Sequence, residues 1–184
     1  MKNRTLTFNG GYELVSLSEQ HLKPLYNWNI EEKHFDKYTC RPLKMAQSFE
    51  EYSYKTLKII SEEKVKIFVL VEKKIYDKPL GKITLFDYNS RNHSAEFGYY
   101  MPSCNRKHGL GIIMLTHFIE KSLADAKLNL NKIYATTSSS NTPSIKLLEK
   151  FNFKLDGRLR EHYWIYDDKF DQLNYSMLKS EWNE

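Results

Sequence analysis

The residues whose types and spacing suggest chemistry lie in the stretch NRKHGLGIIMLTHFIEK, from Asn105 to Lys121. Two glycines, Gly109 and Gly111, follow three basic side chains, and an apolar helical pattern begins directly after them. Helices usually begin behind a Ser, Thr, Asp or Asn residue whose side chain accepts a hydrogen bond from the first turn. A helix that begins behind a basic, glycine-containing loop leaves its first backbone N–H groups, and the positive end of its dipole, available to a ligand.

Such a loop suits a phosphate group, because glycines let a ligand approach the backbone and a helix N-terminus attracts anions. Arg106, Lys107 and His108 would add cationic donors. The dinucleotide fingerprint G-x-G-x-x-G is not completed, because Met114 occupies its third glycine position, and no Gly-Lys-Ser/Thr of a Walker A loop follows. On spacing alone, a phosphate site and a tight turn before a glycine-started helix both stay open.

The composition indicates a folded protein with a mild excess of positive charge. The 184 residues are 41% hydrophobic, 28% charged and 14% aromatic, with a net charge of +5, which is enough for one ordinary domain with a core. The lysines alternate with Glu and Asp and form no basic block, which argues against a nucleic-acid partner. Two cysteines, Cys40 and Cys104, are too few for a disulfide framework, and the six histidines show no metal-ligand spacing.

The first ten residues, MKNRTLTFNG, contain no apolar stretch of signal-peptide length, and no window approaches the length of a membrane span. The sequence also contains no repeats, low-complexity tracts or linkers. We therefore expect a cytoplasmic protein with no membrane partner, whose residues 1–184 form a single α+β domain.

Hydrophobic periodicity predicts the elements that must position the loop. Ser18 and Ser48 are predicted helix caps, and Glu51 takes the capping-box position after Ser48. Residues 31–47 carry no clear pattern and are predicted as a loop with room for a turn of helix. The predicted strands span 12–17, 65–73, 81–88, 95–101 and 132–138, with two further strands over 157–178 around Asp167–Asp168, and the predicted helices span 18–29, 48–63, 111–127 and 142–151.

The order of these elements predicts the topology. The three strands between residues 65 and 101 stand at hairpin spacing, which indicates an antiparallel meander. Pro102 ends the third of them, because proline cannot donate a hydrogen bond to a sheet. The strand–helix–strand unit over 95–138 predicts a parallel strand pair with a right-handed crossover. In the helix that follows, Thr142 is the predicted cap and Pro143 the first helical residue.

Four stretches resemble the GNAT acetyltransferase superfamily. RKHGLG is similar to its R/Q-x-x-G-x-G/A loop, which holds the pyrophosphate of acyl-CoA, and AEFGYYM is similar to its fourth strand. NTPSIKLLEKFNFKLDGRLRE resembles the Asn-x-x-Ser helix and next strand of the RimJ/RimL branch, whose members acetylate N-terminal amines of ribosomal proteins, and KFDQLNYSMLKSEW also resembles that branch. The resemblance covers nearly the whole chain. It implies a GNAT-type acyltransferase fold over residues 1–184, a mostly antiparallel sheet with one parallel, splayed strand pair, flanked by helices.

The resemblance implies acetyl-CoA as the cofactor and a place for it. In the family, two neighbouring parallel strands splay apart and the pantetheine arm lies between them; here these strands are EFGYYM and IYATTS. The arm would pair with backbone groups near Tyr100 and Met101, and the pyrophosphate with the N–H groups from Lys107 to Ile112. The cofactor-binding residues implied in this way are Tyr100, Met101, Arg106, Lys107, His108, Gly109, Leu110, Gly111, Ile112, Asn141, Ser144 and Lys150.

Side chains of the helix over 142–151 receive roles from the same resemblance. Asn141 matches the family's Asn and would contact the pantetheine, Ser144 matches the branch's Ser and would hydrogen-bond the leaving sulfur, and Lys150 matches a Lys near the phosphates. The other readings stay open, namely an ordinary first helical turn for Asn141 and Ser144 and a solvated helix-end lysine for Lys150. Many members carry a Tyr acid seven residues after the Asn, and Leu148 stands there in this chain.

Direct attack of a neutral amine on a thioester needs a proton acceptor, a polarised carbonyl and an acid for the leaving thiolate. Ser144 and Glu96 are the predicted catalytic residues, with Glu96 accepting the proton through water; the other reading of Glu96 is a strand-surface residue paired with a Lys or Arg. Branch members often carry a Glu on the next strand, but no carboxylate lies between Lys132 and Ser140. Cys104 has no His in an activating pattern, so a free thiol is expected there.

We therefore predict an acetyl-CoA-dependent N-acetyltransferase whose acceptor is a primary amine, on a protein N-terminus or a small molecule, with no metal and with a homodimer left open. Two other classes stay open. The missing Tyr acid and the unassigned base motivate a non-catalytic acyl-CoA-binding or sensing module. The positive charge and the aromatic residues motivate a nucleic-acid-binding protein, whose binding would depend steeply on salt.

Overall fold

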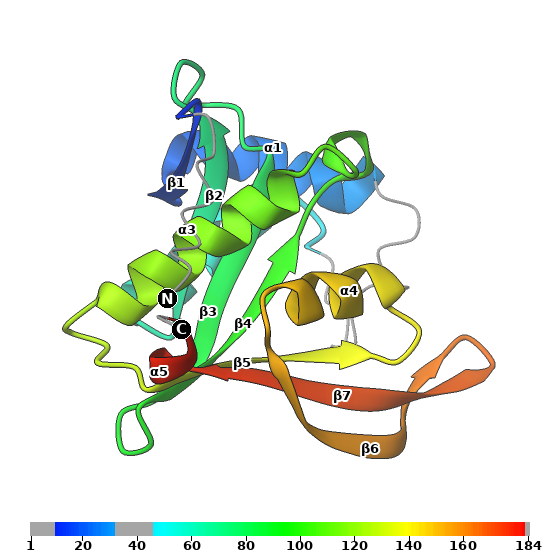
Figure 1. Ribbon diagram of the computed structural model, residues 1–184. Coiled ribbons are helices and arrows are strands. Elements are labelled where there is room, and N and C mark those ends of the chain that lie inside the picture. Colours follow the sequence, from blue (N-terminus) through cyan, green and yellow to red (C-terminus); the bar gives the residue numbers. More distant parts are fainter. Residues whose placement is uncertain (1–9, 32–45, 183–184) are drawn as a thin grey trace.

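The computed structural model describes residues 10–31 and 46–182 of the chain (Figure 1). They form a seven-stranded sheet of order β1-β2-β3-β4-β5-β7-β6, in which β4–β5 is the parallel pair and the other neighbours are antiparallel. The strands are β1 (Tyr12–Ser16), β2 (Val65–Glu72), β3 (Gly81–Asn89), β4 (Ser94–Tyr100), β5 (Lys132–Ser138), β6 (Lys154–Ile165) and β7 (Asp168–Leu178). The helices are α1 (Glu19–Glu31), α2 (Phe49–Ser61), α3 (Leu110–Ala124), α4 (Thr142–Lys150) and α5 (Lys179–Trp182), with a 3₁₀ turn η2 (Ser103–Asn105).

This pairing confirms the predicted α+β class, the antiparallel meander of β2 to β4 and the parallel pair that follows it. Strand β6 begins at Lys154, three residues before the predicted start, because Lys154 and Leu155 already pair with β7. The short helix α5 was not predicted. Most of the predicted loop 31–47 lies outside the described residues.

Helix α3 begins at Leu110, one residue before the predicted start, and ends at Ala124 instead of Lys127. The earlier end has a local cause. The Asp125 carboxylate accepts hydrogen bonds from the N–H groups of Lys127 and Leu128, at 2.9 and 3.3 Å. A side chain that bonds the backbone in this way competes with continuation of the helix.

Helix α2 begins as its sequence predicts. The Glu51 N–H donates to the Ser48 hydroxyl at 3.2 Å, and the Glu51 carboxylate accepts from the Gln47 N–H at 2.7 Å. The Glu side chain thus reaches one residue further back than in an ideal capping box. One N–H group of the first turn is thus satisfied, and the residue before the cap is tied to the same turn, which fixes the start of the helix.

The two faces of the sheet carry different helices, because alternate side chains of a strand point to opposite faces. On β2, Phe68 and Leu70 belong to the core beneath α3 and α4, whereas Val69 and Val71 pack with Leu25 of α1. Figure 1 shows α3 in front of β2 and β3, and α1 behind them. Helices α3 and α4 therefore share one face, and α1 covers part of the other.

Phe118 of α3 ties that helix to the sheet. It is fully buried, and its ring lies 6.3 Å from that of Phe68 on β2 and 5.1 Å from that of Phe97 on β4, measured between centroids. Replacing it leaves a cavity, so Phe118→Ala should lower the free energy of unfolding by about 3–5 kcal/mol. Urea denaturation measures this loss. Trp164→Ala is the control, since Trp164 is 73% exposed, and a loss no larger in Phe118→Ala would contradict the packing.

Candidate active site

The parallel pair β4–β5 opens after three residue pairs. Its register runs Ser94 with Lys132, Ala95 with Ile133 and Glu96 with Tyr134, and no later pair joins these two described strands. Each strand nevertheless continues, because β4 stays paired with β3 as far as Tyr100 and β5 stays paired with β7 as far as its last residue. The two strands diverge beyond Glu96, as Figure 1 shows. Diverging strands leave backbone groups on their facing edges that a ligand can pair with.

The loop that follows β4 presents unpaired N–H groups at the N-terminus of α3. Gly109 caps the helix in the left-handed region, with φ +77°, and no side chain caps it. Ile112 does not fit the prediction, because its N–H already donates to the Gly109 carbonyl at 3.0 Å. Within residues 10–31 and 46–182, the remaining five N–H groups of the loop have no acceptor; they belong to Lys107, His108, Gly109, Leu110 and Gly111.

These donors fit an anion of the size of a pyrophosphate. A Cβ built at Gly109 would meet no atom within 4 Å, so the backbone there is open to a ligand. Lys107 and His108 are exposed beside it. Five N–H groups and the positive helix end together favour negative charge. The backbone of the loop thus provides the available N–H groups that the glycine pattern predicted.

Arg106 makes contacts within the protein that were not predicted, and its predicted contact with the cofactor stays a prediction. Its Nε donates to the Met101 carbonyl at 2.8 Å, and its guanidinium carbon lies 5.9 Å from the centre of the Tyr100 ring. One lone pair of the Met101 carbonyl is therefore used by Arg106, and the predicted contact of this carbonyl with a cofactor stays a prediction. Arg106 holds the end of β4 against the loop, which positions the diverging strand.

The first turn of α4 faces β4. Asn141 is the cap, in place of the predicted Thr142, because the Ser144 N–H donates to its side-chain oxygen at 3.3 Å. Pro143 is accordingly the second helical residue. The ordinary reading of Asn141 as a cap is thus correct for its oxygen. Its amide nitrogen has no acceptor among the described residues, and it remains available to a ligand.

Tyr99 joins β4 to α4 and was not predicted. Its hydroxyl lies 2.7 Å from the Ser144 hydroxyl, although 45 residues separate the two in sequence. Burial raises the pKa of Tyr99 to about 12, and the hydrogen bond to Ser144 opposes this by less. Alternation of side chains along β4 predicts that Tyr99 lies on the same face of the sheet as Phe97, toward α4. No pattern in the sequence predicts that its hydroxyl bonds Ser144.

Two further positions of α4 lie beyond its first turn. Leu148, at the position of the family's Tyr acid, is completely buried in the core and has no acidic proton. Lys150 is exposed in the last turn, six residues after Ser144, so it lies about 9 Å further along the helix axis. Its contact with phosphates stays a prediction.

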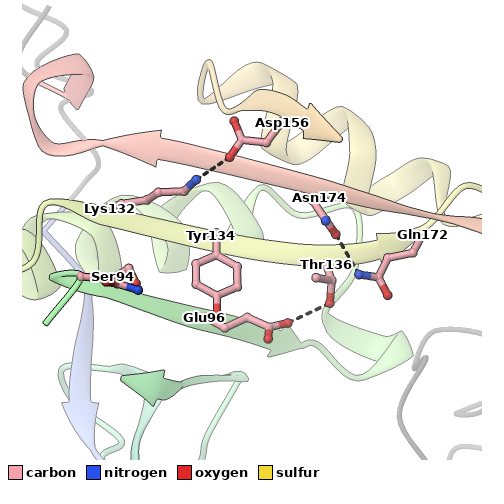
Figure 2. Close-up of a pocket in the computed structure, with 9 residues that line it drawn as sticks. Ser94, Glu96, Lys132, Tyr134, Thr136, Asp156, Gln172 and Asn174 are labelled. Carbon is pink, nitrogen blue, oxygen red and sulfur yellow. Dashed lines mark hydrogen bonds and ion pairs between the residues drawn. The ribbon is translucent and has the colours of Figure 1, made fainter. Parts of the chain in front are cut away.

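Glu96 lies where β4 and β5 make their last pair, on the face opposite Tyr99. It is 7% exposed, and the Thr136 hydroxyl donates to its carboxylate at 2.8 Å. Figure 2 shows both side chains at one end of a pocket of about 540 Å³ that also contains the ion pair Lys132–Asp156. The lining residues are polar: Asn92, Ser94, Glu96, Lys132, Tyr134, Thr136, Asp156, Gln172 and Asn174.

Other predicted features can be placed as well. Cys104 is an exposed free thiol in η2, as expected. Among the residues that the structure describes, no group of three or more His, Cys, Asp or Glu side chains is arranged to bind a metal ion. No described helix is both long and apolar enough to cross a membrane.

Comparison with known proteins identifies a family and several relatives for this chain. A family model described as an acetyltransferase (GNAT) domain matches residues 14–173. YokL of Bacillus subtilis, an uncharacterized N-acetyltransferase derived from the SPbeta prophage, is 32% identical over 107 residues, or 55% of this chain and 56% of YokL. "Putative ribosomal N-acetyltransferase YdaF" of the same organism is 29% identical over 109 residues, or 59% of this chain and 58% of YdaF. The matches thus span little more than half the length of these curated relatives.

Solved structures share the fold at lower identity. A spermidine N-acetyltransferase from Vibrio cholerae, in complex with CoA and spermine, superposes with a TM-score of 0.84 at 23% identity, over 96% of this chain and all of that one. A dodecameric structure of the same enzyme, in an intermediate state, gives a TM-score of 0.79 at 22% identity, over 95% of this chain and 97% of the other. At this identity the likeness shows the arrangement of helices and strands.

Gly109 offers a test of the anion site. Gly109→Val places a branched side chain in a left-handed backbone and fills the approach to the loop, so the dissociation constant for CoA should rise about tenfold or more. Isothermal titration calorimetry measures it, with a melting curve to show that the variant is folded. Gly157→Val is the matched control, because a Cβ there also meets no atom within 4 Å and Gly157 lies on β6. Equal CoA affinity in Gly109→Val and the wild type would rule out the loop as the pyrophosphate site.

Proposed function

This chain belongs to the acetyltransferase (GNAT) family, and we propose that it transfers the acetyl group of acetyl-CoA to a primary amine. GNAT acetyltransferases use acetyl-CoA, and relatives named as N-acetyltransferases are 32% and 30% identical to this chain over 107 and 106 residues. One observation carries the proposal: the gap between β4 and β5 opens next to a loop with five N–H groups that have no acceptor among the described residues. A long, anionic cofactor with an extended arm is the ligand that needs both features.

The residues fit that cofactor in two parts. The N–H groups from Lys107 to Gly111 bind the pyrophosphate, and the facing edges of β4 and β5 bind the amide-containing pantetheine arm. The Asn141 amide nitrogen adds a donor at the start of α4. Acetyl-CoA supplies the thioester whose acetyl group the amine takes. The protein's part is to hold that thioester at the open end of the strands, to accept the proton that the amine loses and to stabilise the leaving thiolate.

Glu96 receives the proton that the acceptor amine must lose. A primary ammonium cannot attack a carbonyl until it is deprotonated, and a carboxylate within reach of one water can accept that proton. Glu96 lies at the base of the splayed strands and faces the polar pocket. The hydrogen bond from Lys132 lowers the pKa of Asp156, which keeps that pair charged. With Glu96, the pocket then holds two carboxylates against one ammonium, which favours a cationic amine as the acceptor.

Ser144 donates a hydrogen bond to the sulfur that leaves. Its backbone is fixed by the Asn141 cap, and its side chain projects from the first turn of α4 toward β4. A hydroxyl at this position stabilises the negative charge that develops on the thiolate. Leu148 cannot contribute an acid, so this role falls to Ser144.

Two features of the sequence narrow the proposed acceptor from any primary amine to particular kinds of amine. The Asn-x-x-Ser helix and the strand after it resemble the RimJ/RimL branch, and the name of the relative YdaF refers to a ribosomal N-acetyltransferase. We therefore place protein N-terminal amines first and small polyamines second, since the structural neighbours act on spermidine. We further infer a single domain over residues 1–184, a cytoplasmic location and a homomeric assembly, for which the dodecameric neighbour gives a precedent.

Thiol release from acetyl-CoA tests the activity. The wild-type chain should release CoA with at least one member of a panel of N-terminal peptides, spermidine, spermine and amino sugars. Replacing the proposed base in Glu96→Gln should lower kcat/KM about a hundredfold, because general-base catalysis contributes roughly that much. Asp156→Asn is the comparison variant in the same pocket: it should raise KM for the amine, because it removes one of the two carboxylates, and leave kcat within about twofold, because Asp156 does not accept the proton.

Two results would remove the proposal in favour of the other classes. CoA binding without turnover across the whole panel would identify an acyl-CoA-binding module. Binding of RNA or DNA that weakens steeply between low and physiological salt, with no CoA binding, would identify a nucleic-acid-binding protein.

A further inference from the structure

The hydrogen bond between Tyr99 and Ser144 spans the open part of the site. Tyr99 lies three residues beyond Glu96, where β4 has already separated from β5, and Ser144 lies in the first turn of α4. Their hydroxyl oxygens are 2.7 Å apart. The catalytic roles assigned above use Ser144 and leave Tyr99 without one.

Acidity decides which hydroxyl donates. A phenol is a stronger acid than an aliphatic alcohol, so it is the better donor and the poorer acceptor. Tyr99 therefore donates to the Ser144 oxygen. The Ser144 hydroxyl hydrogen is then left to point elsewhere, and no other described residue accepts it.

Both partners are held by rigid elements. The Tyr99 ring stacks on the Phe97 ring with a centroid distance of 6.3 Å and an interplanar angle of 23°. The Ser144 N–H is bound by Asn141 in the helix cap at 3.3 Å. A donor whose direction is fixed before the reaction has no reorganisation to undergo when charge develops.

We propose that Tyr99 is a positioning residue, which fixes the Ser144 hydroxyl so that its hydrogen is directed to the leaving sulfur. This inference rests on the proposed function. It also explains how the site works without an acid at Leu148, since the phenol comes from β4 and acts through the serine.

Tyr99 does not itself give up a proton. Burial raises its pKa to about 12, so near pH 8 only about one phenol in ten thousand is ionised. A group of this pKa remains a hydrogen-bond donor over the whole working range, and net proton transfer from it is unfavourable. The phenol therefore orients, and the serine contacts the sulfur.

Four variants test the inference by kinetics with acetyl-CoA and the best amine of the panel. Tyr99→Phe should lower kcat about tenfold, the size expected for loss of one hydrogen bond that orients a donor, and leave the CoA dissociation constant within about twofold. Ser144→Ala should lower kcat at least as much. The double variant should match Ser144→Ala, because Tyr99 acts only through Ser144. Tyr88→Phe is the matched control, since the Tyr88 hydroxyl donates to the Leu128 carbonyl at 3.0 Å, outside the site.

A second readout needs no cofactor and no turnover. Protein labelled with ¹³C at tyrosine Cζ gives one signal per tyrosine, and the Tyr99 signal is the one that Tyr99→Phe lacks. Its titration should give a pKa near 12 in the wild type and a higher value in Ser144→Ala, because the serine stabilises the phenolate. An unchanged Tyr99 titration in Ser144→Ala would overturn the hydrogen bond and the inference.

The kinetic outcomes separate this inference from the proposed function. Wild-type turnover together with undiminished kcat in Tyr99→Phe would overturn the inference and leave the acetyltransferase standing. Effects of the two single variants that multiply in the double variant would also overturn it, because Tyr99 would then act independently. Absence of turnover with every amine would remove the proposed function, and this inference with it.

Discussion

The opening at the candidate site exists because strands β4 and β5 pair over only a short length. Strands β4 and β5 share only three residue pairs, while β4 stays paired with β3 as far as Tyr100, with one register shift, and β5 stays paired with β7 over its whole length. Backbone hydrogen bonds to β3 and β7 thus hold the two strands in separate halves of the sheet. The opening between them is maintained by those outer ladders and does not need a ligand to form. Every side chain assigned to the chemistry lies at the edges of this opening.

Parallel pairing also explains why the two helix ends converge. The carboxyl ends of parallel strands lie at the same edge of a sheet, so the connections after β4 and β5 leave from the same side. Helix α3 begins ten residues after the end of β4, and α4 begins four residues after the end of β5. Both positive helix ends are therefore near the opening. One carries free N–H groups for an anion, and the other carries Asn141 and Ser144.

Local patterns in the sequence predicted most of the helices and strands and the glycine-containing loop before α3. Ser48, Pro102 and Gly109 act through the backbone of their own neighbours, so their effects are readable without a fold. The spacing of the strands predicted the meander and the parallel pair, and the family resemblance led to the splayed strands.

The sequence could not predict contacts made across the fold. Tyr99 meets Ser144 only because the crossover helix brings β4 beside α4. Arg106 bonds the Met101 carbonyl, and the Ile112 N–H bonds within its own turn, so that one predicted N–H contact is used by the protein itself. Thr142 and Asn141 are both good caps by type, and only the geometry of the turn decided between them.

The alternation along β4 puts the proposed cofactor groups and the proposed acceptor pocket on opposite faces of the sheet. Phe97 and Tyr99 point to the side of α3 and α4, whereas Glu96 points to the polar pocket bordered by β6 and β7. The groups proposed to hold the cofactor and its leaving atom lie in residues 99–144, whereas β6 and β7 contribute only to the pocket wall, through Asp156, Gln172 and Asn174. Exchange of pocket residues such as Gln172 or Asn174 leaves the cofactor contacts intact. On the proposed assignment, the choice of amine and the binding of the cofactor depend on opposite faces of the sheet, so substitutions can alter one without the other.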